Sequence, residues 1–280
     1  MRDVRIAVVQ MQARAGMTRK NLDKIEHFTQ EARQKKVDLI CFPELCIHGY
    51  DMNKALSGAE PIEPIPGESA LAVSEMARRA GMVVLAGMAE KADQGNPFIT
   101  QLVAFPDGTL QKYRKTHLGR YEQPYFAAGD EFPFFITDQA RFGIQICWES
   151  HFPEVTTILA LKGGEIIFAP HASPSAATDR RDLWIKYLCA RAYDNTVFVA
   201  ACNLFGDNGT SQDFGGGAMV IDPKGNILAE AFNGKEEMLV VDLDSRLINT
   251  IRCQEGRSMR DTFYLRARRP ELYGDLWQLR

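Results

Sequence analysis

The sequence lacks several features that would assign it to other classes of protein. It has no apolar run of about 18 residues, as a membrane-spanning helix needs, and residues 1–10 are too short and too charged for a secretory signal. Its 33 basic and 36 acidic residues give a net charge of -3, with no long run of lysine and arginine. We therefore expect a soluble, cytoplasmic protein that binds neither nucleic acid nor a membrane.

Cysteine and histidine are present, but not at the spacings of structural sites. The six cysteines form no Cys-x-x-Cys pair and lie at irregular intervals, so in a reducing compartment most should be free and buried. The five histidines never fall at the close spacing that zinc sites favour, so we expect no metal and no cofactor.

Apolar segments of two different periods alternate along the chain. Residues 4–11 and 37–42 have the composition of buried strands, whereas residues 18–36 and 179–195 carry apolar side chains at helical spacing. The 280 residues are 45% hydrophobic, which is enough for a full core, and no linker or repeat divides them. We predict an α/β fold of two mixed sheets between helical layers, forming a single domain over residues 1–280.

Residues 141–154, RFGIQICWESHFPE, place a thiol at the end of a strand. The apolar run 142–146 ends at Cys147, and a helix over residues 155–161 follows Pro153 and Glu154, which suit a first helical turn. A cysteine beside a helix start faces unpaired N–H groups, which favour the thiolate and can hold an oxyanion. Cys147 is therefore either a nucleophile or, as a free cysteine often is, a small buried hydrophobe.

Glu44 and Lys115 occupy similar positions in two other segments. Glu44 follows the strand predicted at 37–42, and Lys115 lies late in the strand predicted at 109–117. Each has a structural explanation, as a loop charge or as one cation in the run 112–115. If the three strands point the same way, however, a carboxylate, an ammonium and a thiol converge at one edge. Their repeated position after buried strands favours a common site.

Three short motifs, in this order, resemble those of the nitrilase superfamily of carbon-nitrogen hydrolases. They are FPEL at 42–45 with GY at 49–50, YRKTHL at 113–118, and GIQICWE at 143–149 with FPE at 152–154. Further similarity at 6–10, 164–167, 222–225 and 269–273 extends the resemblance over nearly the whole chain. It implies a four-layer α-β-β-α sandwich, often dimerised through helices and a C-terminal arm.

The resemblance also implies a role for each residue of the site. Glu44 is the general base, Lys115 the cationic stabiliser and Cys147 the nucleophile, while Glu122 best matches the second glutamate of the amidase branches. The expected reaction is hydrolysis of a non-peptide carbon–nitrogen bond in a small linear amide or N-carbamoyl substrate. It proceeds through a cysteine thioester and releases ammonia.

Two other functions stay open at this point. The Cys-Trp-Glu sequence occurs in nitrile-cleaving relatives as well as in amidases, so the nearest enzymatic alternative is a nitrilase that converts a nitrile to acid and ammonia. The alternative from another class is a catalytically silent scaffold or binding protein with the same fold. Intact Glu44, Lys115 and Cys147 argue against the silent protein.

Aromatic and polar residues in or beside the loops after these strands are candidates for the walls of a substrate pocket. They are Tyr50, Tyr121, Tyr125, Trp148, Glu149, His171, Ser173 and Trp184. A structural role is an equal alternative for each, such as packing of a helix by Trp184. Arg180 and Arg181 could meet a substrate carboxylate, although adjacent arginines at a helix start are more often a solvated face.

The C-terminal segment, residues 255–280, has little periodicity and is predicted to be an arm. Its apolar side chains need a surface to cover them: Tyr264, Leu265, Leu272, Tyr273, Leu276 and Trp277. We therefore expect a homodimer or a higher homo-oligomer.

Overall fold

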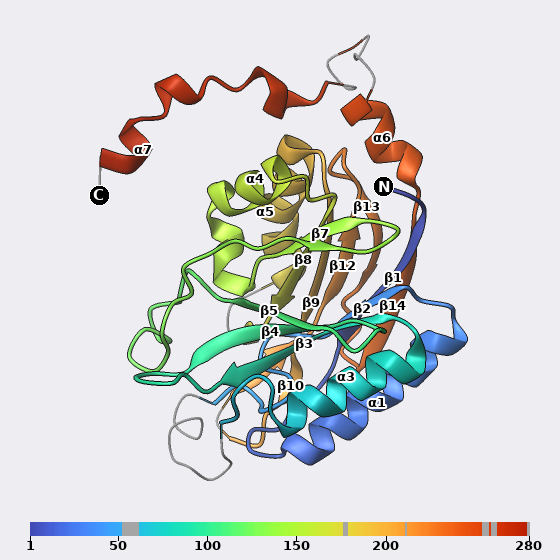
Figure 1. The fold of residues 1–280 in the computed structure, drawn as a ribbon, viewed down its shortest axis with the longest axis vertical. Coiled ribbons are helices and arrows are strands. Elements are labelled where there is room, and N and C mark those ends of the chain that lie inside the picture. Colours follow the sequence, from blue (N-terminus) through green and yellow to red (C-terminus); the bar gives the residue numbers. More distant parts are fainter. Residues whose placement is uncertain (52–61, 176–178, 211, 254–257, 259–261, 279–280) are drawn as a thin grey trace.

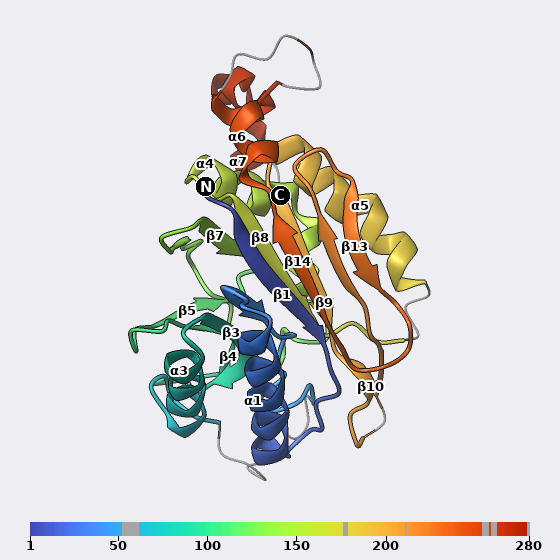
Figure 2. The ribbon, with the colours of Figure 1, turned by 90° about the vertical axis from the view of Figure 1, so that its right-hand side faces the viewer.

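Two mixed sheets pack face to face between two helical layers (Figures 1 and 2). The structure is a computed structural model that describes residues 1–51, 62–175, 179–210, 212–253, 258 and 262–278. Each of the two large sheets has six strands within these residues. The predicted α-β-β-α sandwich is therefore confirmed.

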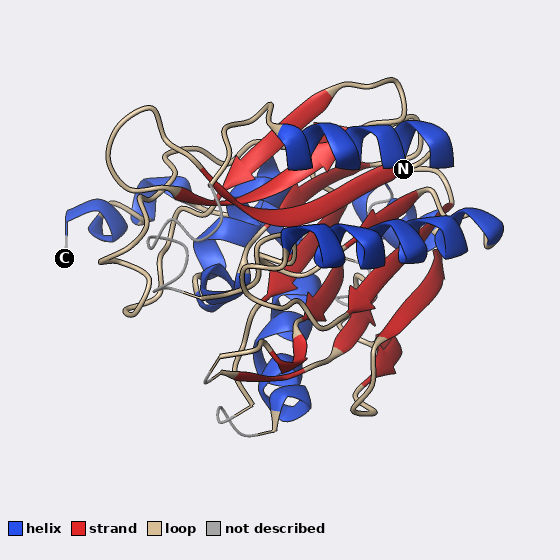
Figure 3. Cartoon of the chain, turned by 90° about the horizontal axis from the view of Figure 1, so that it is seen from below, coloured by secondary structure: helices blue, strands red, loops and turns tan. Residues whose placement is uncertain are grey.

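The first sheet has the strand order β14-β1-β2-β3-β4-β5. Its strands are β14 (Glu237–Leu243), β1 (Val4–Gln10), β2 (Leu39–Cys41), β3 (Val83–Glu90), β4 (Phe98–Ala104) and β5 (Leu110–Arg114). Helices α1 (Thr18–Gln34) and α3 (Glu68–Ala80) lie side by side over its outer face, as Figure 3 shows from below. They bury Ile25 and Val73 against it, as expected for amphipathic helices.

The second sheet has the order β13-β12-β9-β8-β7-β6. Its strands are β13 (Ile227–Ala231), β12 (Ala218–Ile221), β9 (Phe198–Asn203), β8 (Ile166–His171), β7 (Arg141–Ile144) and β6 (Phe135–Ile136). Helices α4 (Pro153–Leu161) and α5 (Arg180–Asn195) cover its outer face with Leu159 and Trp184. β12 and β13 form an antiparallel pair across the turn at residues 222–225.

Strand β1 explains why the central strands appear in the sequence as continuous apolar runs. Ile6 and Val8 face the core between the sheets, while Ala7 and Val9 face the layer under α1 and α3. A strand buried on both faces has a nearly continuous apolar run, without the alternation of a half-exposed strand.

Strand directions bring the ends of β2, β5 and β7 to the site. β2 and β3 are parallel, and two antiparallel steps through β4 make β5 parallel to β2. In the second sheet β7, β8 and β9 are all parallel. β5 ends earlier than predicted, at Arg114, so Lys115 lies just beyond its strand, as Glu44 and Cys147 do.

Several short elements were not predicted from the sequence. They are β6, the separate pair β10 (Phe205–Asp207) and β11 (Asp213–Gly215), and a 3-10 helix, η1 (Cys147–His151). Each has at most five residues, which is too few for a hydrophobic period to be recognised.

The C-terminal segment leaves the body after α6 (Ser245–Cys253) and curves over α4 in Figure 1. It contains η3 (Tyr264–Ala267), η4 (Pro270–Leu272) and α7 (Asp275–Gln278). Leu272 and Leu276 are exposed, as an arm without a covering surface would leave them. The predicted arm also includes 255–257, 259–261 and 279–280 and the side chain of Trp277, which lie outside the described parts. Among the described helices, none is long and apolar enough to span a bilayer.

Candidate active site

Lys115 is the centre of a buried cluster of charges. Its Nζ lies 2.7 Å from Glu44 Oε1 and 2.8 Å from Glu122 Oε1, and its side chain is 0% exposed. Tyr50 donates its hydroxyl to the same Glu122 oxygen at 3.0 Å, and the Gly119 N–H donates to the other oxygen at 2.6 Å. The structure therefore brings three of the predicted catalytic residues into direct contact.

The backbone that follows β2 crosses over β3, and this crossing brings Glu44 next to Lys115. β2 and β5 are separated in the sheet by β3 and β4, so Glu44 would be distant if the chain ran straight on. The turn at 43–45 instead lies against Gly87 of β3, where a methyl group would overlap the backbone of Pro43 and Leu45. The Gln101 side-chain amide of β4 then donates to the Phe42 carbonyl at 3.0 Å. Gly87 is thus required by close packing rather than by its own backbone angles.

Cys147 sits on a sharp elbow between β7 and α4. Its φ is 47°, in the left-handed region that side chains other than glycine rarely adopt. The elbow continues as η1, and α4 then starts at Pro153, which adds Pro153 and Glu154 to the helix predicted at 155–161. The sulfur is 3.5 Å from Ser173 Oγ, at the end of the neighbouring strand. A nucleophile held on an elbow in this way projects its side chain clear of the two elements that it joins.

The protonation of the site follows from its burial and its excess of carboxylates. Burial raises the pKa of Glu44 to about 7; Lys115 opposes this shift and Glu122 adds to it. Burial alone would lower the pKa of Lys115, but Glu44 and Glu122 outweigh it and the pKa is raised. At neutral pH the lysine is charged, and Glu44 is divided between its acid and its carboxylate forms.

The cysteine rests as a thiol. Burial and the Glu44 charge raise the pKa of Cys147 to about 12, against the attraction of Lys115. The expectation that a helix start favours the thiolate is therefore wrong for the resting site, because η1 is only five residues long and the sulfur is desolvated. Glu44 interacts with the thiol, and its Oε2 has no hydrogen-bond partner among the residues that are described. A base for the thiol proton is thus in place.

The predicted wall residues differ in their positions. Tyr50 and Ser173 lie in the site, whereas Trp148 is 45% exposed and packs on His151, with ring centroids 4.9 Å apart. Tyr121 is 81% exposed and faces outward. The carboxylate of Glu149 is 0% exposed and is enclosed by donors of the protein, so the structure places it behind the site.

The remaining candidates have structural contacts. His171 is buried, with Nδ1 2.7 Å from the Ala169 carbonyl, and its ring packs on Trp184, with centroids 4.8 Å apart. Tyr125 is partly buried and packs against the core between the sheets. Arg181 is paired with Glu230 at 2.8 Å on the surface. Binding of a substrate carboxylate by Arg180 stays a prediction.

Asn203 was not predicted, although it ends β9 next to the other site strands. Its Oδ1 accepts the Ser173 N–H at 2.7 Å, and its amide donates to the Gly216 carbonyl at 2.9 Å. It therefore holds Ser173 beside Cys147. The signal that could have identified it is its position as a polar residue at the end of the buried strand β9.

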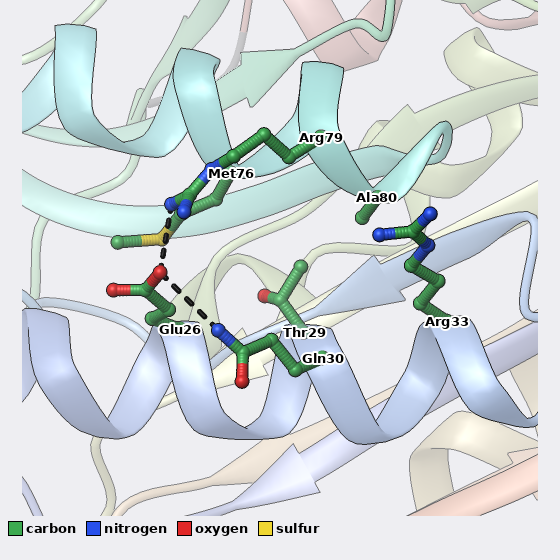
Figure 4. Close-up of a pocket in the computed structure, with 7 residues that line it drawn as sticks. All are labelled: Glu26, Thr29, Gln30, Arg33, Met76, Arg79 and Ala80. Carbon is green, nitrogen blue, oxygen red and sulfur yellow. Dashed lines mark hydrogen bonds and ion pairs between the residues drawn. The ribbon is translucent and has the colours of Figure 1, made fainter.

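The cleft between α1 and α3 (Figure 4) is separate from this site. It has a volume of about 140 Å³, and its carboxylate, Glu26, is paired with Arg79 at 2.7 Å and accepts a hydrogen bond from Gln30. This cleft therefore joins two helices and offers no reactive group. No group of three His, Cys, Asp or Glu side chains in the described ranges could hold a metal ion.

Comparisons with known proteins agree with this geometry. A family model described as carbon-nitrogen hydrolase matches residues 5–252. The chain is 33% identical to a 2-oxoglutaramate amidase of Bacillus subtilis (84% of this chain, 88% of the relative) and 31% identical to an N-carbamoylputrescine amidase of Arabidopsis thaliana (90% and 88%). A cysteine-to-alanine mutant of the Nesterenkonia sp. AN1 amidase, in complex with butyramide, superimposes with a TM-score of 0.80 at 25% identity (96% and 95%). The chain is therefore an enzyme of the carbon-nitrogen hydrolase family, within the nitrilase superfamily, as its motifs indicated.

Proposed function

We propose that this enzyme hydrolyses small linear amides or N-carbamoyl compounds through a thioester on Cys147. The observation that carries the proposal is the contact of Lys115 with Glu44 at 2.7 Å and with Glu122 at 2.8 Å, beside a thiol that interacts with Glu44. Relatives that are amidases support the choice of reaction.

In the first half-reaction Glu44 accepts the Cys147 proton while the sulfur attacks the amide carbon. The carbonyl oxygen becomes an oxyanion, for which Lys115 and the backbone N–H after Cys147 are the donors. Glu44 then gives its proton to the departing nitrogen, so ammonia leaves and the thioester remains. This order requires a base with a pKa near neutrality, and that of Glu44 is about 7.

In the second half-reaction Glu44 deprotonates a water molecule that attacks the thioester. The carbon–sulfur bond breaks, the sulfur recovers a proton and the carboxylic acid leaves. With an N-carbamoyl substrate the product is a carbamate, which decomposes to CO₂ and the amine. Glu122 anchors Lys115 throughout and offers an acceptor for the amide NH₂ group.

The test measures ammonia release from a panel of aliphatic amides, including butyramide, and from N-carbamoyl amines and nitriles. We expect turnover of at least one amide or carbamoyl compound, loss of turnover in Cys147→Ala, and a hydroxamate when hydroxylamine traps the thioester. Full turnover by Cys147→Ala would exclude this mechanism. Hydrolysis of a nitrile to the acid while the matching amide stays inert would instead identify a nitrilase.

Iodoacetamide labelling separates a live site from a silent scaffold. One cysteine that reacts fast is expected, because Glu44 can accept the Cys147 proton as the sulfur attacks; its rate should rise with pH through about 7, and peptide mapping should place the label on Cys147. Six uniformly slow thiols would favour the scaffold.

A further inference from the structure

Glu149 is a buried carboxylate with an unusual number of donors around it. Its side chain is 0% exposed. Oε1 accepts from the Tyr113 hydroxyl at 2.6 Å, from the Thr116 hydroxyl at 2.6 Å and from the Thr116 N–H at 2.7 Å, and Oε2 accepts from the Ile146 N–H at 2.5 Å. The backbone N–H groups can only donate, so an acceptor must stand opposite them.

These donors come from the two segments that carry the catalytic lysine and the nucleophile. Tyr113 and Thr116 flank Lys115 at the end of β5, in the first sheet, whereas Ile146 precedes Cys147 in the second sheet. The two oxygens of one carboxylate therefore connect the lysine segment to the cysteine elbow. The connection spans the two sheets, because β5 and β7 belong to different ones.

The same carboxylate supports the left-handed elbow at Cys147. The Glu149 N–H donates to the Ile146 carbonyl at 3.0 Å, while its side chain accepts the Ile146 N–H. This is the glutamate half of a capping box, with the side chain turned back on the residue that begins the helical turn. The support lies where it is needed, since Cys147 has a φ of 47° without being glycine.

We infer that Glu149 is a positioning residue, which fixes Lys115 and Cys147 at a working separation without touching the substrate. The inference rests on the proposed function for the identity of the reacting groups. Burial and the Glu149 charge also raise the pKa of Tyr113, so the phenol stays a donor to Glu149 at every working pH. Loss of the carboxylate should misplace the nucleophile relative to its oxyanion donor.

Glu149→Gln is the direct test. Glutamine has the same size, but an NH₂ group replaces one of the two carboxylate oxygens and then faces an O–H or N–H donor. A misplacement of about 1 Å costs roughly 100-fold in rate, so we expect kcat to fall by about that factor. KM should change by less than about threefold, since the substrate contacts are intact. The rate of Cys147 alkylation by iodoacetamide should fall as well. That rate is measured without any amide substrate.

Asp222→Asn is the matched control. Asp222 is a buried carboxylate, 6% exposed, that accepts the N–H groups of Lys224 at 2.8 Å and Asn226 at 2.9 Å. It lies in the turn after β12, at the end of the second sheet away from Cys147. We expect Asp222→Asn to lower the thermal midpoint while kcat and the alkylation rate stay within about twofold of wild type.

Thr116→Val makes the inference testable if Glu149→Gln does not fold. It removes one donor to Glu149, keeps the backbone N–H and preserves the shape of the side chain. We expect a smaller loss of kcat, about threefold to tenfold, the scale of one hydrogen bond, with KM unchanged. A folded Glu149→Gln protein with wild-type kcat and alkylation rate would overturn the inference. If only Thr116→Val folds, a wild-type kcat in that variant would overturn it. Absence of amide turnover in wild type, with alkylation still dependent on Glu149, would refute only the proposed function.

Discussion

Strand β5 and Lys115, the residue after it, contribute to two clusters of charge, one on each face, and the two clusters have opposite composition. On one face a single cation, Lys115, lies between two carboxylates, Glu44 and Glu122. On the other face a single carboxylate, Glu90, lies between two cations, with Lys112 Nζ at 2.5 Å and Arg114 Nη2 at 2.6 Å. The alternation of side chains along a strand separates the two clusters.

The composition decides whether a proton can move. Burial alone would raise the pKa of Glu90, but the hydrogen bonds from Arg114, Lys112 and Thr100 outweigh it and the pKa is lowered, so this carboxylate stays ionised. Glu44 is more deeply buried and shares its cation, Lys115, with Glu122, and its pKa is raised to about 7. Where carboxylates outnumber cations in a buried cluster, one carboxyl group can exchange a proton. Where cations outnumber carboxylates, every group stays charged.

The largest expected effect follows from removal of Lys115, the single cation between Glu44 and Glu122. Lys115→Met keeps the length of the side chain but leaves Glu44 and Glu122 without a positive charge between them. We expect kcat to fall by about 1,000-fold, the upper range for one oxyanion donor. The pKa of Glu44 should rise further, because the attraction of Lys115 lowers it. The measurement is kcat across pH with the best amide.

Lys115→Arg is the matched control, because it keeps the charge but presents a larger planar group in a fully buried position. Activity should be impaired, while the pH midpoint should move less than in Lys115→Met. A wild-type kcat in Lys115→Met would show that this cation does not take part in the reaction.

The next effect concerns Glu44 and has two pH dependences of opposite sign. Activity needs the ionised base, so kcat should increase as the pH rises through about 7. Stability should change the other way. A carboxyl whose pKa is raised on folding contributes stability fully below its ordinary value of 4.5, and this contribution is lost as the pH rises to about 7.

Glu44→Gln should abolish both dependences. We expect kcat to fall by about 100-fold or more, which is typical for loss of a general base. Urea unfolding at about pH 5 and about pH 7.5 should show wild type losing stability relative to Glu44→Gln as the pH rises. The same pH slope of stability in the two proteins would mean that Glu44 does not hold the exchangeable proton.

The fold could be predicted because its signals are local and repeated. Buried strands such as β1 carry a continuous apolar run, here Ile6 to Val9, and α1 carries Leu22 and Ile25 on one face. Short elements such as β6 are formed by pairing with a neighbour, which no local pattern records. The end of β5 at Arg114 was missed for a related reason, since Lys115 keeps the alternation of the strand and its N–H still donates to the Ile99 carbonyl of β4 at 2.8 Å.

The site was predictable in its residues but not in its connections. Cys147 and Glu44 follow apolar runs, Lys115 lies late in a predicted strand, and the motifs around the three residues identify them. Glu149 was assigned to the substrate pocket because it lies beside the loop that follows the strand ending at Cys147. Its burial depends on Tyr113 and Thr116, whose contacts with it join the two sheets. Contacts between distant segments decide the role of such a residue, and the sequence does not record them.

The smallest expected effect belongs to the cluster of Glu90 with Lys112 and Arg114. Glu90→Gln removes the carboxylate from Lys112 and Arg114, whose side chains are each 34% exposed and can be solvated by water. We expect kcat to stay within about twofold of wild type and stability at neutral pH to fall by about 1–2 kcal/mol, the scale of charged hydrogen bonds reduced by partial exposure.

The pH dependence of Glu90→Gln should be the reverse of that of Glu44→Gln. A carboxyl whose pKa is lowered on folding contributes stability above 4.5 and loses it as the pH falls through the folded value. The destabilisation of Glu90→Gln should therefore be full at about pH 7 and should shrink toward about pH 4 in urea titrations. A tenfold loss of kcat would show that the two faces of β5 are coupled, and that the Glu90 cluster helps to place Lys115.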